Sequence, residues 1–263
     1  MSTLARRKVL TALATAPLAG VSLAAVLADP RRARAAAMGL EPVTLTTEGG
    51  KTVKASLGLP AKAPAAAIVL IHEWWGLNDQ IKAVAAEFAK EGYIALAVDL
   101  YDGRIGGTPE EARAIMQSVN PVEATDTLAS WIGWLRGHGK SSGKIGTVGW
   151  CFGGGWSLSA SIARPVDATV VYYGRVNHPV DELTALQGPV LGHFATRDRW
   201  INTEMVGGFE DAMGTAGKSA EVHWYEADHG FANPTTSRYD ADDAQLAWRR
   251  TLAFFGAHLT GDA

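Results

Sequence analysis

The only cysteine of the chain, Cys151, stands in a setting that suits a nucleophile. It lies in the run Gly149-Trp150-Cys151-Phe152-Gly153-Gly154, after an apolar stretch typical of a buried strand and before a segment typical of a helix. A sharp turn from strand to helix exposes the side chain at its apex, and flanking glycines avoid Cβ clashes with the strained backbone there. A small cysteine buried in a core strand is the alternative interpretation. The glycines favour a thiol nucleophile.

A thiol nucleophile needs a base, and the base needs a carboxylate to orient it. His229 follows the predicted strand 222–225 by four residues, and Asp198 follows the predicted strand 190–195. Asp228 is the alternative acid, but adjacent side chains rarely form a good acid–base hydrogen bond. The order nucleophile, acid, histidine is that of α/β-hydrolases.

The segment 71–78 follows the first buried central strand and therefore reaches the same rim of the predicted sheet. In α/β-hydrolases a backbone N–H from this loop and the N–H after the nucleophile hold the oxyanion, which nominates Trp74 and Phe152. Glu73 is expected close to the thiol. The side chains of Trp74 and Trp75 are equally consistent with core packing.

The elements that must position these residues alternate between strands and helices. Because the central strands are apolar throughout, we expect an α/β fold of the α/β-hydrolase type, with a mostly parallel sheet covered on both faces and ligands bound at the carboxyl ends of its strands. We predict strands at 43–46, 53–57, 66–71, 93–98, 145–148, 168–173, 190–195 and 222–225, and helices at 81–90, from 109, and at 121–136, 156–163, 204–216 and 241–258.

The first 37 residues have the anatomy of an export signal. Arg6-Arg7-Lys8 precedes an apolar stretch, and small-residue cleavage sites lie at 33–37, which predicts a cleaved signal of the twin-arginine type. An uncleaved membrane anchor is the alternative. The remaining 38–263 form one predicted α/β domain.

The charge of the chain argues against nucleic acid as a partner. Six of its 24 basic residues but one of its 27 acidic residues lie within 1–37, so the remainder carries 18 basic and 26 acidic residues, a formal net charge of −8. Such a body lacks the basic surface that nucleic acids require. A single cysteine also excludes an intramolecular disulfide and leaves a thiol redox protein without a resolving cysteine.

Several segments together resemble the dienelactone hydrolase family, from about residue 43 to 258. They are His72-Glu73-Trp74-Trp75-Gly76, Asp99-Leu100-Tyr101, Gly149 to Gly154, Thr196-Arg197-Asp198 and His223-Trp224-Tyr225 through Asp228-His229-Gly230-Phe231-Ala232. The resemblance implies an α/β-hydrolase fold and a Cys151-His229-Asp198 triad. It also implies that Glu73 contacts the resting thiol until an anionic substrate displaces it.

The same resemblance implies a substrate and the residues that hold its carboxylate. The family opens the lactone of dienelactones to give maleylacetate, without a metal or cofactor. In agreement, His72-Glu73 is not a zinc motif, because the residue four after His72 is Gly76. Members that act on dienelactone carry a carboxylate-holding arginine four residues after the catalytic histidine, where this chain has Asn233. Arg104 is the candidate for the second anchor.

We further expect Tyr101 and Trp75 to contact the substrate. Since Asn233 cannot replace a bidentate guanidinium, we expect neutral esters and lactones to be hydrolysed at least as well as anionic ones.

The sequence therefore predicts an exported, monomeric hydrolase that cleaves a small lactone or ester by thiol acyl transfer, with the export machinery as its other partner. A general carboxylesterase using the same residues is the alternative enzyme. A non-catalytic binding protein on a hydrolase scaffold is the alternative of a different class, which the complete triad order disfavours.

Overall fold

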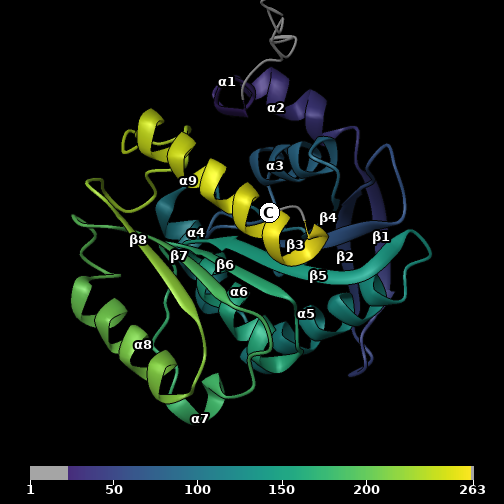
Figure 1. Ribbon diagram of the computed structural model, residues 1–263. Helices are drawn as coiled ribbons and strands as arrows, with labels where there is room; N and C mark the ends of the chain where they lie inside the picture. Colours follow the sequence, from purple (N-terminus) through teal and green to yellow (C-terminus); the bar gives the residue numbers. More distant parts are fainter. Residues whose placement is uncertain (1–22, 262–263) are drawn as a thin grey trace, which may run out of the picture.

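A computed structural model describes residues 23–261. Its centre is an eight-stranded sheet of order β1-β2-β4-β3-β5-β6-β7-β8 (Figure 1). β1 and β2 pair antiparallel, as do β2 and β4, and the strands from β4 to β8 run parallel to one another. The strands are β1 (Glu41–Thr46), β2 (Thr52–Gly58), β3 (Ala65–Ile71), β4 (Ile94–Val98), β5 (Ser141–Trp150), β6 (Ala168–Tyr172), β7 (Val190–Ala195) and β8 (Ala220–Tyr225).

Helices cover both faces of this sheet, which confirms the predicted three-layer architecture. Successive residues of β3 point to opposite faces, so Ile68 and Leu70 pack with α3 and α9, whereas Val69 and Ile71 pack with α5 and α6. All four side chains are fully buried, as expected for a parallel strand between two helical layers. The helices that follow β3 are α3 (Asp79–Lys90), α4 (Pro109–Gln117), α5 (Pro121–Arg136), α6 (Phe152–Ala163), α7 (Val180–Leu183), α8 (Thr203–Thr215) and α9 (Ala241–Phe255), which continues as the π-helix η1 (Gly256–Thr260).

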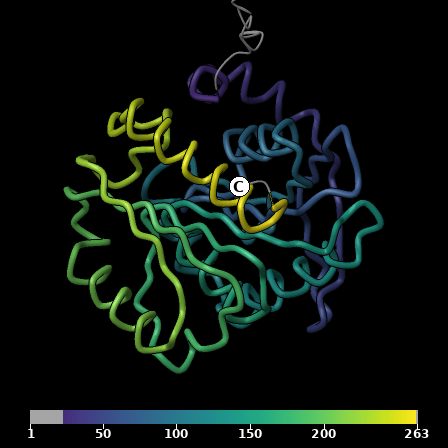
Figure 2. The backbone as a smooth tube through the Cα atoms, in the orientation of Figure 1, coloured from purple at the N-terminus to yellow at the C-terminus, as the bar shows by residue number. Residues whose placement is uncertain are grey.

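Part of the predicted export signal is folded against this body. α1 (Leu23–Leu27) and α2 (Pro30–Ala37) lie beside α3, at the top of the molecule in Figures 1 and 2. Val26, Leu27 and Ala33 are buried in the same apolar cluster as α3 and α9. Residues 23–37 therefore contribute to the core of the whole chain, which the composition of a signal does not reveal.

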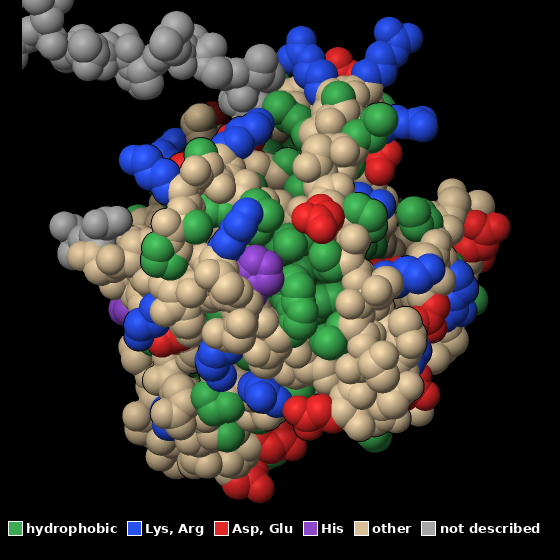
Figure 3. Space-filling view, turned by 90° about the vertical axis from the view of Figure 1, so that its right-hand side faces the viewer, with side chains coloured by type: hydrophobic (Ala, Val, Ile, Leu, Met, Phe, Trp, Pro, Cys, Tyr) green, Lys and Arg blue, Asp and Glu red, His purple; other side chains and the backbone are tan. Residues whose placement is uncertain are grey.

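The rest of that signal, residues 1–22, lies outside the described residues, so export and cleavage stay predictions. Among residues 23–261 no helix is both long and apolar enough to span a bilayer. α2 instead carries exposed arginines, and basic side chains gather at the top of the face shown in Figure 3.

The turn between β5 and α6 is the tightest feature of the fold. The backbone of Cys151 has φ 55° and ψ −116°, a conformation that residues other than glycine rarely adopt. The backbones around it leave no room for a Cβ at the nearby glycines. A Cβ on Gly149 would lie 2.0 Å from the carbonyl oxygen of Gly153, and one on Gly153 would lie 2.2 Å from that of Ile71. These contacts place the start of α6 directly against the end of β3.

Gly153→Ala should therefore destabilise the protein by about 3 kcal/mol, because backbone atoms must move to admit the methyl group. Gly208→Ala is the matched control, since an added Cβ meets nothing within 4 Å in the exposed face of α8. It should raise the free energy of unfolding by up to about 1 kcal/mol, through helix propensity alone. Urea unfolding of both variants checks this, and equal stability of Gly153→Ala and the parent would contradict the packing described.

Candidate active site

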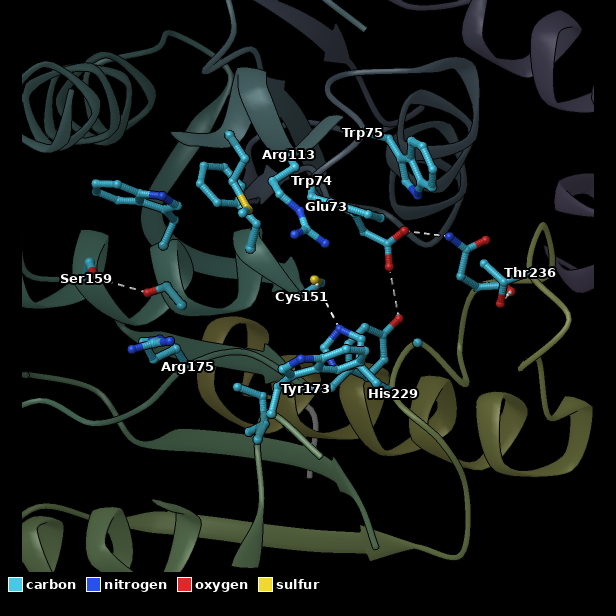
Figure 4. Close-up of a pocket in the computed structure, with 18 of the residues that line it drawn as sticks. Glu73, Trp74, Trp75, Arg113, Cys151, Ser159, Tyr173, Arg175, His229 and Thr236 are labelled. Atoms are coloured by element: carbon cyan, nitrogen blue, oxygen red, sulfur yellow. Dashed lines mark hydrogen bonds between the residues drawn. The ribbon is translucent and has the colours of Figure 1, made fainter. Parts of the chain in front are cut away.

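The structure brings Cys151, His229 and Asp198 together at the carboxyl edge of the sheet, although each follows a different strand. Nε2 of His229 lies 3.1 Å from Sγ of Cys151. Nδ1 of the same ring lies 2.6 Å from Oδ2 of Asp198. Figure 4 shows the thiol pointing toward the imidazole across the floor of a cavity. The three groups thus form one chain of hydrogen bonds from carboxylate to thiol.

Backbone donors and an aromatic ring hold this chain in place. Oδ1 of Asp198 accepts the N–H groups of Trp200 and Ile201, at 2.8 and 3.1 Å. The Asp198 side chain is fully buried, so both of its oxygens are fixed. The ring of Trp200 packs edge-on against that of His229, with centroids 5.2 Å apart. The orientation of the imidazole is therefore set before any ligand binds.

The same contacts shift the pKa values of the acid and the histidine in opposite directions. Burial alone would raise the pKa of Asp198, but the hydrogen bond and positive charge of His229 and the two backbone donors lower it overall. Burial alone would lower the pKa of His229, but its hydrogen bonds to Asp198 and Cys151 and their charges raise it to about 10. The arrangement favours the protonated form of the imidazole that lies between Asp198 and Cys151.

Glu73 lies beside the thiol in the pocket, but its carboxylate is held by other partners. Asn233 donates its side-chain amide to one oxygen, and the Tyr173 hydroxyl donates to the other at 3.4 Å. Burial raises the pKa of Glu73, while the Asn233 hydrogen bond and the nearby charge of His229 oppose this. The expected interaction of Glu73 with the resting thiol is not made as a hydrogen bond among the described side chains. Among the described side chains, the thiol has His229 as its hydrogen-bond partner.

The buried side chain of His72 holds the main chain of Glu73 in place. Its Nε2 accepts the N–H of Leu100 at 3.2 Å, so its Nδ1 carries the proton and donates it to the Glu73 carbonyl at 2.7 Å. Burial lowers the pKa of His72, in agreement with a neutral ring. This histidine is structural.

A cavity of about 770 Å³ surrounds the thiol. It is lined by most of the residues that the sequence nominated, namely Glu73, Trp74, Trp75, Cys151, Phe152, His229 and Asn233. Trp74 and Trp75 pack on each other, with ring centroids 4.8 Å apart, and both form part of its wall. Phe152 begins α6, where main-chain N–H groups have no partner within the helix. Asp198 lies behind His229, outside the cavity wall.

Two nominated residues, Tyr101 and Arg104, do not line this cavity. Tyr101 is fully buried and packs edge-on against His72 at 4.5 Å between centroids. Arg104 lines a separate cavity of about 130 Å³ and donates Nε to the Tyr101 carbonyl at 3.0 Å. The backbone of Arg104 also passes close to Gly76, where a Cβ would lie 2.5 Å from the Arg104 carbonyl oxygen. The structure therefore places neither side chain in the wall of the cavity around the thiol.

Sequence reasoning missed the cations that line the pocket. Arg113 of α4, Arg175 after β6 and Arg238 after the His229 loop all contribute to its wall. Figure 4 shows Arg113 projecting from the wall toward Cys151. Because ligands bind at the carboxyl ends of parallel strands, Tyr173 and Arg175, which come just after β6, could have been predicted. No motif points to Arg113. The pocket is thus more cationic than the loss of the arginine at Asn233 suggested.

A mostly parallel sheet with a cysteine, an aspartate and a histidine after β5, β7 and β8 has the arrangement of the α/β-hydrolase class. Within that class, the chain belongs to the dienelactone hydrolase family, whose model matches residues 53–259. The resemblance seen in the sequence is confirmed, and the chain is a hydrolase of the lactone and ester type.

Individual relatives agree with this membership. The chain is 31% identical to a carboxymethylenebutenolidase of Pseudomonas putida over 225 residues, which cover 81% of this chain and 95% of the relative. It is similar in structure to a Klebsiella pneumoniae protein assigned as a dienelactone hydrolase, with a TM-score of 0.73, 25% identity and 82% and 98% of the two chains covered. A dienelactone hydrolase-like promiscuous phosphotriesterase from metagenomic libraries, 20% identical, shares the fold with a TM-score of 0.76 over 84% and 99% of the chains.

The opposite pKa shifts of Asp198 and His229 predict how stability depends on pH. The Asp198 pKa is lowered from 3.8, so its contribution is present above that pH and is lost as the pH falls through the lower folded value. The His229 pKa is raised from 6.5 to about 10, so its contribution is complete below pH 6.5 and is lost as the pH rises toward 10.

The free energy of unfolding lost in His229→Gln should therefore be larger at about pH 6 than at about pH 10. Urea unfolding of parent and variant at both values measures the two differences. A difference that stays constant, or grows with pH, would show that the imidazole is not held as a cation.

Proposed function

We propose that this chain hydrolyses a small carboxylic ester or lactone by transferring the acyl group to Cys151. The observation that carries the proposal is the continuous contact from Asp198 through His229 to the thiol, at 2.6 and 3.1 Å, with His229 and Cys151 in the wall of one cavity. A thiol alone in a pocket would not need an oriented imidazole. The carboxymethylenebutenolidase relatives support a butenolide-type lactone as the substrate.

The reaction would proceed in two halves. The Cys151 thiolate attacks the carbonyl carbon, and the N–H groups of Trp74 and Phe152 hold the oxyanion of the tetrahedral intermediate. His229 then gives its proton to the leaving oxygen, and a thioester remains on Cys151. A water molecule loses a proton to His229 and attacks the thioester, which releases the acid and restores the thiol.

Asp198 supports both halves by keeping the imidazole in one orientation and stabilising its charged form. Glu73 takes no proton in this scheme, because Asn233 and Tyr173 occupy its oxygens. The wide cavity admits neutral esters as well as lactones, so a general carboxylesterase uses the same steps on a different substrate.

Cys151→Ala should reduce the hydrolysis of p-nitrophenyl acetate by at least about 10⁴-fold, since the nucleophile is lost. Cys151→Ser should fold and remain slow, because a hydroxyl is not ionised by this imidazole as a thiol is. Initial rates on purified protein measure both. Activity of Cys151→Ala near that of the parent would reject the thiol mechanism and favour a different nucleophile.

The two candidate acids, Asp198 and Asp228, provide a matched pair of variants for the same assay. Asp198→Asn should lower kcat by about 10⁴-fold, because the amide favours the wrong tautomer of His229. Asp228→Asn removes a carboxylate whose ion-pair partner is Arg197 at 3.5 Å on the surface, and should change kcat by less than about threefold. A reversed order of the two effects would make Asp228 the orienting acid.

A further inference from the structure

The far end of the catalytic cavity contains a second group of linked polar side chains. Oγ of Ser159 lies 3.2 Å from Nε2 of His178, and Nδ1 of His178 lies 2.7 Å from a carboxylate oxygen of Glu182. Ser159, His178 and Arg175 all line the cavity. In Figure 4, Ser159 and Arg175 lie on the side of Cys151 opposite Trp75 and Thr236. None of these residues takes part in the proposed mechanism.

Glycines bring these residues together from two elements. A Cβ on Gly154 would lie 2.8 Å from Cα of Gly174, and one on Gly155 would lie 3.3 Å from the Arg175 carbonyl oxygen. The absence of a Cβ at Gly154 lets the segment after β6 approach α6 so closely, and Gly155 keeps the contact with Arg175 free of crowding. Arg175 and His178 are thereby placed beside Ser159, which lies two turns along α6 from Cys151.

The charge of this region is unbalanced. Arg175, Arg113 and Arg238 line the cavity, and within residues 23–261 none of them forms an ion pair with an acidic side chain. The one carboxylate that lines it, Glu73, is buried and hydrogen-bonded to Asn233 and Tyr173. An uncompensated cationic cavity in a protein of net negative charge attracts anions.

We propose that Arg175, Ser159 and His178 form a subsite for a carboxylate at the end of the acyl chain of the substrate, remote from the carbonyl that Cys151 attacks. The inference rests on the proposed function and names its substrate class, a monoester of a long-chain dicarboxylic acid. Arg175 supplies the permanent charge, the Ser159 hydroxyl turns from the Gly155 carbonyl to donate its one proton to the carboxylate, and His178 forms the wall beside them. A guanidinium and a carboxylate match in geometry and can form two parallel hydrogen bonds.

The acyl side follows from the position of His229. Its Nε2 must protonate the leaving oxygen, so the leaving group lies beside His229 and the acyl chain is free to extend along the side of the cavity where Figure 4 shows Ser159 and Arg175. Ser159 is eight residues after Cys151, a separation of about 12 Å along α6 at the usual rise of a helix. A short diacid cannot span this distance, whereas a chain of eight or so methylenes can.

A second Ser-His-Glu nucleophile is the competing interpretation of the same residues. Ser159 also donates its single proton to the Gly155 carbonyl at 3.1 Å, so the imidazole competes with the helix backbone for it. Ser159 also lies inside α6, whereas Cys151 lies at a strained turn beside the free N–H groups at the start of that helix. The geometry therefore favours binding over catalysis at Ser159.

The test uses mono-p-nitrophenyl esters of succinic, adipic and sebacic acid, each paired with its uncharged methyl ester. The parent should prefer the charged sebacate ester to its methyl ester and show less preference in the succinate pair. Arg175→Gln should lower kcat/KM for the charged sebacate ester by about ten- to a hundredfold, the value of a charge-assisted bidentate contact. Ser159→Ala should lower it by about threefold or more, and every methyl ester should stay within about twofold of the parent.

The control variant is Arg199→Gln. This exposed arginine follows Asp198 and does not line the cavity, so its loss removes one positive charge without touching the subsite. If Arg199→Gln and Arg175→Gln reduce the rates on all charged esters equally, the cause is the overall electrostatic attraction of the protein for anionic substrates, and the subsite is rejected. Ser159-dependent hydrolysis that survives in Cys151→Ala would also reject it, in favour of a second nucleophile.

These results separate the two proposals. Loss of all ester hydrolysis in Cys151→Ala, together with no selective effect of Arg175→Gln, would overturn the subsite and leave the thiol mechanism standing. Full hydrolysis of the methyl esters by Cys151→Ala, with no dependence on Ser159, would overturn the proposed function itself.

Discussion

The backbone at Cys151 is the constraint on which the rest of the structure depends. Its φ of 55° and ψ of −116° turn the chain from β5 directly into α6, so the thiol stands at the apex of the turn. The conformation persists only because Gly149 and Gly153 let three backbone segments approach within distances that no Cβ allows. The same close packing places the unpaired N–H groups at the start of α6 beside the loop that carries Trp74. The nucleophile and the candidate oxyanion donors therefore come from one local arrangement.

Charged groups near the turn set the protonation state of His229, which lies beside the thiol. The buried Asp198 and the thiol flank His229 and favour its charged form, which a neutral environment of the same shape would not do. Glu73 could compete for the imidazole, but Asn233 and Tyr173 hold its carboxylate, and burial raises its pKa. Asn233 thus has a definite place in this chain. It binds the acid that stands next to the thiol, while the cations of the pocket come from other elements.

Much of this arrangement could be predicted from the sequence, because it follows from strand ends. Cys151, Asp198 and His229 each come after a strand that could be recognised in the sequence, and parallel strands bring their carboxyl ends to one edge. The start of α6 at Phe152 was not predicted, since three successive glycines disfavour a helix and only tertiary packing explains them.

The side of a loop from which a side chain projects could not be predicted either. Arg104 follows its motif closely, yet its guanidinium donates to the Tyr101 carbonyl and lines a different cavity. Arg113 enters the pocket from α4, where helical periodicity describes an exposed surface position. The Ala- and Leu-rich segment 23–37 has the composition of a signal, and only its packing on α3 shows that it is also part of the core.

Acyl transfer to Cys151 is tested most directly by mass spectrometry. The enzyme is quenched rapidly with acid while it hydrolyses an ester, and the mass of the peptide that contains Cys151 is measured. The mass of one acyl group should be added to Cys151 during the steady state, and it should disappear when the substrate is exhausted. Detection of the acyl group on Ser159, or continued hydrolysis with no adduct on either residue, would contradict acyl transfer to this thiol.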